Sequence, residues 1–198
     1  HYHGPDNNAV AHDTAVGPPR RYQWIAFPQW QRSHHIMPSM NSLLASQSRL
    51  YTVEDVASAE HIALPGRYAL ICRDAFSGIE LWRVTFPDWH STLIYDKNMP
   101  VQLQRRCAAI GDIVYCTPGY FAPVTALDAA TGETLVSYAG TNGTEEIVLR
   151  DGTLLVVVGS PSSGDPILNP EGYEVSAKYS GMSSPCLAML SGSMIIEP

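Results

Sequence analysis

A short phrase of the sequence occurs twice and constrains the fold more than any other feature. The first copy begins at Asp74 and reads Asp-Ala-Phe-Ser-Gly-Ile-Glu-Leu-Trp. The second begins at Asp128, 128 − 74 = 54 residues later, and reads Asp-Ala-Ala-Thr-Gly-Glu-Thr-Leu-Val. Repeats with a period of roughly 20–50 residues are typical of solenoids, propellers and arrays, in which neighbouring units bury each other's apolar faces. The slightly longer spacing here fits such a unit with a long loop.

The composition fits a β-rich domain and argues against some classes of partner. The chain has 198 residues, of which 45% are hydrophobic, and its 15 Gly and 15 Pro suit many short strands joined by turns. The net charge of −7 gives no electrostatic basis for binding nucleic acid or an anionic membrane. The basic pairs Arg20-Arg21 and Arg105-Arg106 are expected to lie on solvated edges. No apolar run approaches the ~20 residues of a membrane span.

Turn chemistry predicts three β-hairpins, each with a two-residue connection. The connections are Gln47-Ser48, Gly111-Asp112 and Asp151-Gly152. Gly-Asp suits a type II′ turn and Asp-Gly suits a type I′ turn, whereas Gln-Ser is a weaker signal because it offers no glycine for positive φ. The expected strand pairs are 42–46 with 49–54, 106–110 with 113–117, and 145–150 with 153–158.

The repeated phrase itself is predicted to be a tight turn between a third and a fourth strand. The Asp carboxylate can accept backbone N–H groups, the Ser or Thr hydroxyl can do the same, and Gly takes the left-handed conformation. The third and fourth strands are expected at 68–73 and 80–85 in the first copy, and at 124–127 and 133–138 in the second. Each copy then forms one four-stranded antiparallel unit. The residues expected to build these turns are Asp74, Ser77, Gly78, Trp82, Asp128, Thr131 and Gly132.

The chain is expected to divide into three parts. Residues 1–40 are irregular and Pro-rich, although Arg21 to Ala26 could form the last strand of a preceding unit. Residues 41–159 hold the repeated units. Residues 160–198 form a loop-rich tail, with a helix or a strand possible near Cys186 to Leu190.

On these residues the chain resembles the quinoprotein-like β-propellers, whose repeats are called PQQ-like. The first copy matches at Asp74, Ser77, Gly78 and Trp82, and the second has Val136 where that family places a Trp that docks between blades. The resemblance implies an all-β propeller of four-stranded antiparallel blades that is incomplete, with two full blades and part of others. A complete propeller has at least four blades. The chain is therefore expected to be a truncated propeller, an open blade array, or part of a ring completed by further copies or by a protein partner.

The resemblance leaves two functions open. The family includes dehydrogenases that bind pyrroloquinoline quinone (PQQ) beside calcium, and also cofactor-free scaffolds. Such enzymes place a vicinal Cys pair over the quinone, but no Cys-Cys dipeptide occurs here, and no Asn ligand can be tied to Glu54 and Asp55. We therefore expect a non-catalytic scaffold or binding module, with no catalytic residues and no cofactor, in a periplasmic or extracellular setting. The alternative is a fragment of a PQQ-dependent or related oxidoreductase.

The cysteines and histidines carry the remaining candidate chemistry. Across the Gly111-Asp112 turn, Cys107 faces Cys116 in a non-hydrogen-bonded pair, where Cα atoms are about 4.5 Å apart. That spacing approaches the range of a disulfide. Two interpretations stay open: a cross-strand disulfide in an oxidising compartment, or two reduced thiols in a β core. The seven His residues match no zinc or haem motif, so no metal site is expected.

Overall fold

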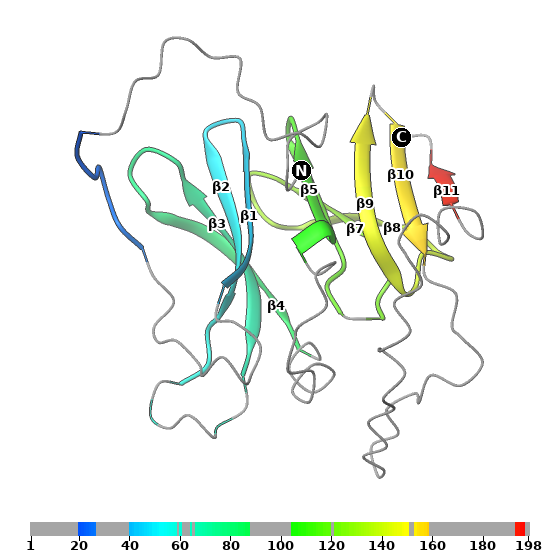
Figure 1. The fold of residues 1–198 in the computed structure, drawn as a ribbon, viewed down its shortest axis with the longest axis horizontal. Coiled ribbons are helices and arrows are strands. Elements are labelled where there is room, and N and C mark those ends of the chain that lie inside the picture. The colour runs from blue at the N-terminus through cyan, green and yellow to red at the C-terminus, as the bar shows by residue number, and fades with distance from the viewer. Residues whose placement is uncertain are drawn as a thin grey trace.

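The computed structural model describes residues 20–26, 40–58, 60, 64, 66–87, 104–119, 121–150, 153–158 and 193–196, and these form three antiparallel sheets side by side (Figure 1). Sheet A holds β1 (Met40–Ser46), β2 (Arg49–Asp55), β3 (Tyr68–Asp74) and β4 (Glu80–Phe86). Sheet B holds β5 (Cys107–Ile110), β6 (Ile113–Cys116), β7 (Thr125–Asp128) and β8 (Thr134–Ser137). Sheet C holds β9 (Thr144–Arg150), β10 (Thr153–Val158) and β11 (Ser193–Ile196).

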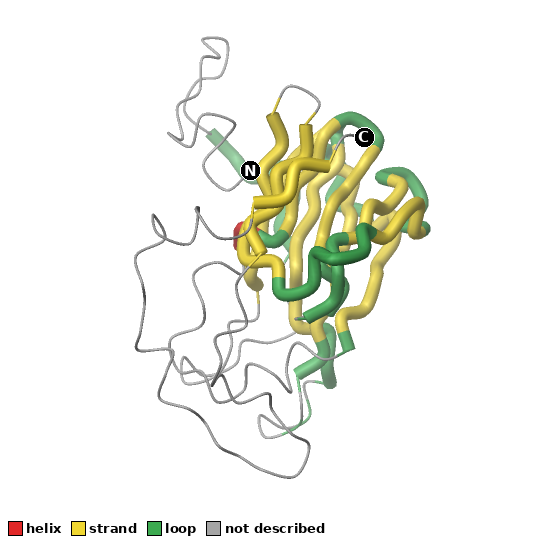
Figure 2. Tube along the Cα trace, turned by 90° about the vertical axis from the view of Figure 1, so that its right-hand side faces the viewer, coloured by secondary structure: helices red, strands yellow, loops and turns green. Residues whose placement is uncertain are grey.

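Sheets A and B share one topology. Their strands are ordered β1-β2-β3-β4 and β5-β6-β7-β8, so each is a simple antiparallel meander. Apart from a short helical turn at residues 104–105, the described part is built of strands and loops (Figure 2). Within that part no helix is long or apolar enough to cross a bilayer. Four-stranded antiparallel sheets stacked in sequence order define an incomplete β-propeller, and each sheet is called a blade below.

The expected strands are confirmed to within about two residues, and two hairpin turns can be compared. Gly111 has a φ of 54° while Asp112 does not take positive φ, which is the sign pattern of the expected type II′ turn. Gln47 and Ser48 take φ values of 49° and 60°, so the first hairpin uses the type I′ pattern without glycine. The third connection, Asp151-Gly152, lies outside the described residues.

Two expectations need correction. Arg21 to Ala26 forms no strand in the described part. Within the tail, Ser193–Ile196 forms a short strand, β11, while the loop-rich character expected for the rest of the tail stays a prediction. Arg106 does not lie on a solvated edge, because it is only 2% exposed, and Arg105 pairs with Glu146 of β9 at 3.3 Å. The possible element near residues 186–190 lies outside the described residues.

Alternation along the strands gives the central sheet B two buried faces. Tyr51 and Val53 of β2 join the core between sheets A and B. Sheet B supplies Val114 to that core and its neighbour Tyr115 to a second core, between sheets B and C. Successive side chains of a strand point to opposite faces, so the central sheet is apolar on both sides.

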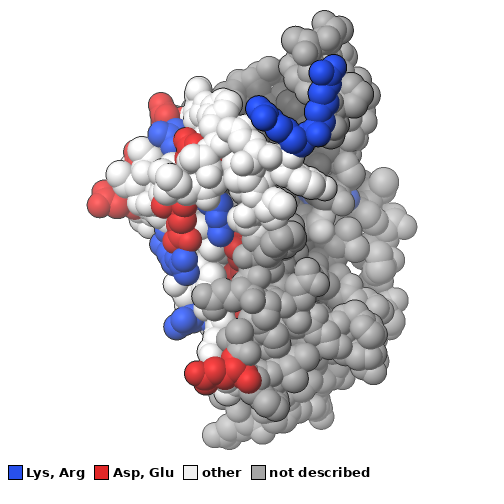
Figure 3. All heavy atoms as spheres, turned by 90° about the vertical axis from the view of Figure 1, so that its left-hand side faces the viewer, with Lys and Arg blue, Asp and Glu red and all other residues white. Residues whose placement is uncertain are grey.

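Charged side chains on the end of the array at sheet A show no single sign. Figure 3 looks onto this end and shows basic and acidic side chains interspersed on its described part. At the junction of sheets A and B, Arg49 reaches Asp112 of the facing hairpin at 3.7 Å. This ion pair links two neighbouring hairpins.

Candidate functional site

The candidate site is the turn formed by each copy of the repeated phrase, because a neighbouring segment docks on it. In the first copy, Asp74 Oδ1 accepts hydrogen bonds from the backbone N–H groups of Phe76 at 3.0 Å and Ser77 at 2.6 Å, and from the Ser77 hydroxyl at 2.7 Å. The Gly78 N–H donates to the Asp74 carbonyl at 2.9 Å, and Gly78 takes a φ of 75°.

The second copy repeats this geometry. Asp128 Oδ1 accepts from the N–H groups of Ala130 at 2.9 Å and Thr131 at 2.8 Å, and from the Thr131 hydroxyl at 3.1 Å. The Gly132 N–H donates to the Asp128 carbonyl at 2.8 Å, and Gly132 takes a φ of 77°. The sequence pattern alone therefore specifies a self-contained hydrogen-bonded turn at both places.

These bonds favour the charged form of both carboxyl groups. Hydrogen bonds from the backbone N–H and the hydroxyl of Ser77 hold the pKa of Asp74 below its usual value. Thr131 does the same for the pKa of Asp128. A hydrogen bond donated to the charged form favours that form. Each carboxylate is thus an ionised acceptor that organises a turn, which is a structural role.

The Trp of the first copy docks on the turn of the second. Trp82 belongs to β4 of sheet A, and its indole N–H donates to the Ala129 carbonyl at 3.0 Å. A Cβ atom added to Gly132 would lie 2.7 Å from Trp82 Cε3, so the ring lies directly against the glycine. The ring is 9% exposed and tilts against Tyr51 with centroids 5.9 Å apart. Trp82 therefore packs between blades, as the resemblance implies.

Trp24 makes the same contact one blade earlier. Its indole N–H donates to the Ala75 carbonyl at 3.0 Å, and a Cβ on Gly78 would lie 2.5 Å from Trp24 Cδ2. Gln23 Nε2 adds a hydrogen bond to the Phe76 carbonyl at 2.6 Å. The docking role of Trp24 was missed from the sequence. The available signal is its distance from the turn glycine, 78 − 24 = 54 residues, against 132 − 82 = 50 for Trp82.

Val136 occupies the position in sheet B that corresponds to the docking tryptophan of sheet A. It pairs with Ala126, a residue of the core between sheets B and C, so it occupies on sheet B the place that Trp82 occupies on sheet A. The Val136 side chain is 43% exposed. A small side chain here leaves the B–C junction without the indole that reaches across the A–B junction.

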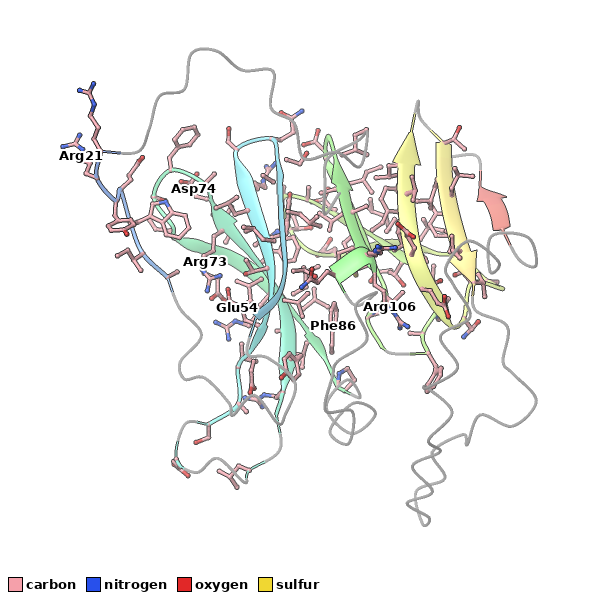
Figure 4. The ribbon with its side chains drawn as sticks, in the orientation of Figure 1. Arg21, Glu54, Arg73, Asp74, Phe86 and Arg106 are labelled. Carbon is pink, nitrogen blue, oxygen red and sulfur yellow. The ribbon has the colours of Figure 1, made fainter. Side chains whose placement is uncertain are left out.

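The acidic residues at the end of β2 are engaged in structural contacts. Glu54 and Arg73 lie side by side (Figure 4), with Glu54 Oε1 2.5 Å from Arg73 Nη1 and Glu54 Oε2 3.2 Å from Arg73 Nη2. The Thr52 hydroxyl also donates to Glu54 Oε1. Asp55 Oδ1 accepts the N–H groups of Ala57 at 3.0 Å and Arg67 at 3.1 Å, which closes the loop before β3. Neither carboxylate is presented as an open ligand for a cation.

Cys107 and Cys116 are Cα partners in the register expected from the hairpin. The structure has both as free, buried thiols, so the disulfide is not present in it. Burial raises the pKa of Cys107 to about 12 and raises that of Cys116 well above its ordinary value. Among the described residues, no three His, Cys, Asp or Glu side chains gather into a group that could hold a metal ion.

Comparison with known proteins does not identify a family. No family profile matches the sequence, and no curated protein matches it. Among solved structures, the chain is similar to the quinohemoprotein alcohol dehydrogenase from Comamonas testosteroni, with 14% identity and a TM-score of 0.35. The match covers 68% of this chain but only 21% of that enzyme. A likeness at this level says nothing of a shared activity.

Proposed function

We propose that the chain is a non-catalytic β-propeller module, a scaffold or binding unit that works with further copies of itself or with a protein partner in a periplasmic or extracellular setting. The observation that carries the proposal is the repeated docking contact. Trp24 on Gly78 and Trp82 on Gly132 are two instances of one joint, in which an indole docks on the turn of a blade. A joint that recurs along an array builds a surface by stacking, which is how repeat proteins present binding faces.

The use of the acidic side chains supports a structural role. Asp74 and Asp128 are turn acceptors, Glu54 is bound by Arg73, and Asp55 closes a loop. The sequence has no adjacent Cys pair of the kind that PQQ dehydrogenases place over the quinone, and Cys107 and Cys116 lie on opposite strands of a hairpin. These observations support a cofactor-free role, and we derive no reaction step through PQQ.

A dye-reduction assay separates the two functions. The purified chain is incubated with PQQ, calcium, a primary alcohol and an artificial electron acceptor. We expect the rate to equal that of the mixture without protein. Saturable dye reduction by the wild-type chain that is lost in Glu54→Gln or Asp55→Asn would overturn the proposal in favour of the oxidoreductase alternative.

A further inference from the structure

Residues 20–26 lie where the fourth strand of a blade before sheet A would run. At the A–B junction, the docked indole belongs to β4, a fourth strand. At the turn of sheet A, the docked indole belongs to the segment 20–26. Both indoles bond to the equivalent carbonyl at 3.0 Å and both lie against the equivalent glycine. The segment therefore lies where a fourth strand would run, although it forms no strand itself and no third strand lies beside it in the described part.

The segment is exposed on both sides of its tryptophan. Tyr22 is 85% exposed and Ile25 is 58% exposed. Within the described residues, no backbone group of residues 20–26 is hydrogen-bonded to another backbone group. A segment that is held by side-chain contacts, and not by a backbone ladder within the described part, can still join a sheet edge.

At the opposite end of the array, sheet C has three strands in the described part. Sheet C is ordered β11-β10-β9, so β11 corresponds to β3 and β7, the third strands of sheets A and B. In those sheets a fourth strand lies beside the third, whereas among the described residues none lies beside β11. Figure 1 places residues 20–26 at one end of the long axis and β11 at the other.

We propose that residues 20–26 of one copy form the fourth strand of sheet C in a second copy, by pairing with β11. This inference rests on the proposed function and names its partner. Apolar side chains at both ends of the array suit the junction, since Leu155 and Val157 of β10 are only half-buried and Leu43 of β1 is exposed. Their burial between two copies would favour association.

The number of copies follows from the number of blades. Joined in this way, each copy contributes three four-stranded blades, two of its own and one completed by its neighbour. Head-to-tail contacts close into rings when the rotation permits. Propellers typically have about four to eight blades, so three blades are too few, nine are too many, and two copies give six. The structure assigns a closed dimer as the assembled form.

Sedimentation of the full chain and of one substitution pair tests the inference. We expect wild-type protein at twice the 21.6 kDa of one chain. Ile25→Pro removes a ladder N–H while keeping Trp24, and should weaken the dimer at least about tenfold. The control Ile25→Thr keeps the N–H and should remain dimeric. Far-UV circular dichroism checks that each variant is folded.

A competing peptide provides a second readout that needs no folded variant. A synthetic peptide of residues 20–26 should dissociate the wild-type dimer, and the same peptide with Ile25→Pro should not. A monomeric wild type, or a dimer unaffected by Ile25→Pro and by the peptide, overturns the inference. If that protein is also inert in the dye-reduction assay, the proposed non-catalytic role stands, so the two failures are distinguishable.

Discussion

The indole ring of Trp82 lies against Gly132 so closely that a methyl group on that glycine would stand 2.7 Å from Trp82 Cε3. Gly132 also takes a φ of 77°, which L-residues with a Cβ rarely adopt. The glycine is thus required both by its backbone conformation and by its neighbour. The close contact with Trp82 comes from the neighbouring blade, so a glycine at this position of the turn indicates that another blade packs against it.

A pair of glycine substitutions separates the two requirements. Gly132→Ala should lower the free energy of unfolding by about 3 kcal/mol, because left-handed strain adds to overpacking against the ring. Gly111→Ala is the matched control, since Gly111 has a φ of 54° but no atom within 4 Å of an added Cβ. It should lose only about 1 kcal/mol. Urea unfolding measures both, and equal losses would contradict a steric role for Trp82.

Two substitutions of Trp82 test the joint from the other side. Trp82→Ala should cost about 3–5 kcal/mol, the usual loss for a buried aromatic residue. Trp82→Phe keeps an aromatic ring but removes the indole N–H that bonds to Ala129, and should cost about 1–2 kcal/mol. The same changes at Trp24, which is more exposed, should cost less. Denaturant midpoints provide the comparison, and a greater loss at Trp24 would contradict the burial difference.

The first hairpin can be stabilised by supplying the residues that its turn requires. Gln47 and Ser48 both take positive φ, which suits Asn-Gly far better. Replacing them with Asn and Gly should raise the free energy of unfolding by about 1 kcal/mol. Ser48→Gly alone should give part of that gain. A lower thermal midpoint for the double variant would show that the two side chains make contacts that outweigh the backbone strain.

Buried thiols predict a loss of stability in alkali. Burial raises the pKa of Cys72 to about 11 and that of Cys107 to about 12. A folded pKa above the unfolded one means that the folded state holds its proton more tightly. The contribution to stability is therefore full below the unfolded pKa, and it is lost as pH rises through the folded pKa values. Each thiol can remove up to about 1.4 kcal/mol per pH unit in that window.

Unfolding curves between pH 8 and pH 12 check this expectation, with Cys72→Ala as the comparison because it removes one of the titrating thiols. The variant should lose less stability with rising pH than the wild type. Parallel curves would show that Cys72 does not contribute. Tyr51, whose pKa burial raises to about 12, acts in the same direction and is present in both proteins.

The disulfide between Cys107 and Cys116 stays a prediction. The register places the two residues opposite each other, but burial keeps both thiols protonated, and the thiolate is the reactive form. We expect the bond to form during oxidative refolding, with the mass falling by two hydrogens, and not when the folded reduced protein is exposed to oxidised glutathione. Rapid oxidation of the folded protein would contradict the raised pKa values.

The sequence predicts the elements whose geometry is set locally. The turn glycines and the Asp-x-x-Ser/Thr-Gly phrase determine where strands end, so the boundaries of sheets A and B follow from short segments. The strand β11 could not be found in this way, because its four residues are extended through pairing with β10 across a long stretch of chain. Tertiary pairing decides such segments, and local propensity does not.

The sequence predicts the hydrogen bonds of the docking turns but not the long-range contacts around them. The turn hydrogen bonds follow from the phrase itself, but the contact of Glu54 with Arg73 depends on the register of β2 against β3, in which Arg73 reaches past Thr52. The position of Trp24 against Gly78 depends on residues 20–26, which form no helix or strand. Both are long-range contacts, and the sequence signal for the second is the spacing of Trp24 from Gly78, which is close to that of Trp82 from Gly132.

The two docked tryptophans also bear on how far the chain can be altered. The indole-to-carbonyl bond spans 51 residues at Trp24 and 47 at Trp82, yet the bond length is 3.0 Å in both cases. The bond between indole and carbonyl is therefore the same although the number of residues between the tryptophan and its turn differs. Peptide tags or reporter domains inserted between β4 and β5, away from the docking turns, should leave the stacking of blades intact, which makes this connection an attachment point for engineering.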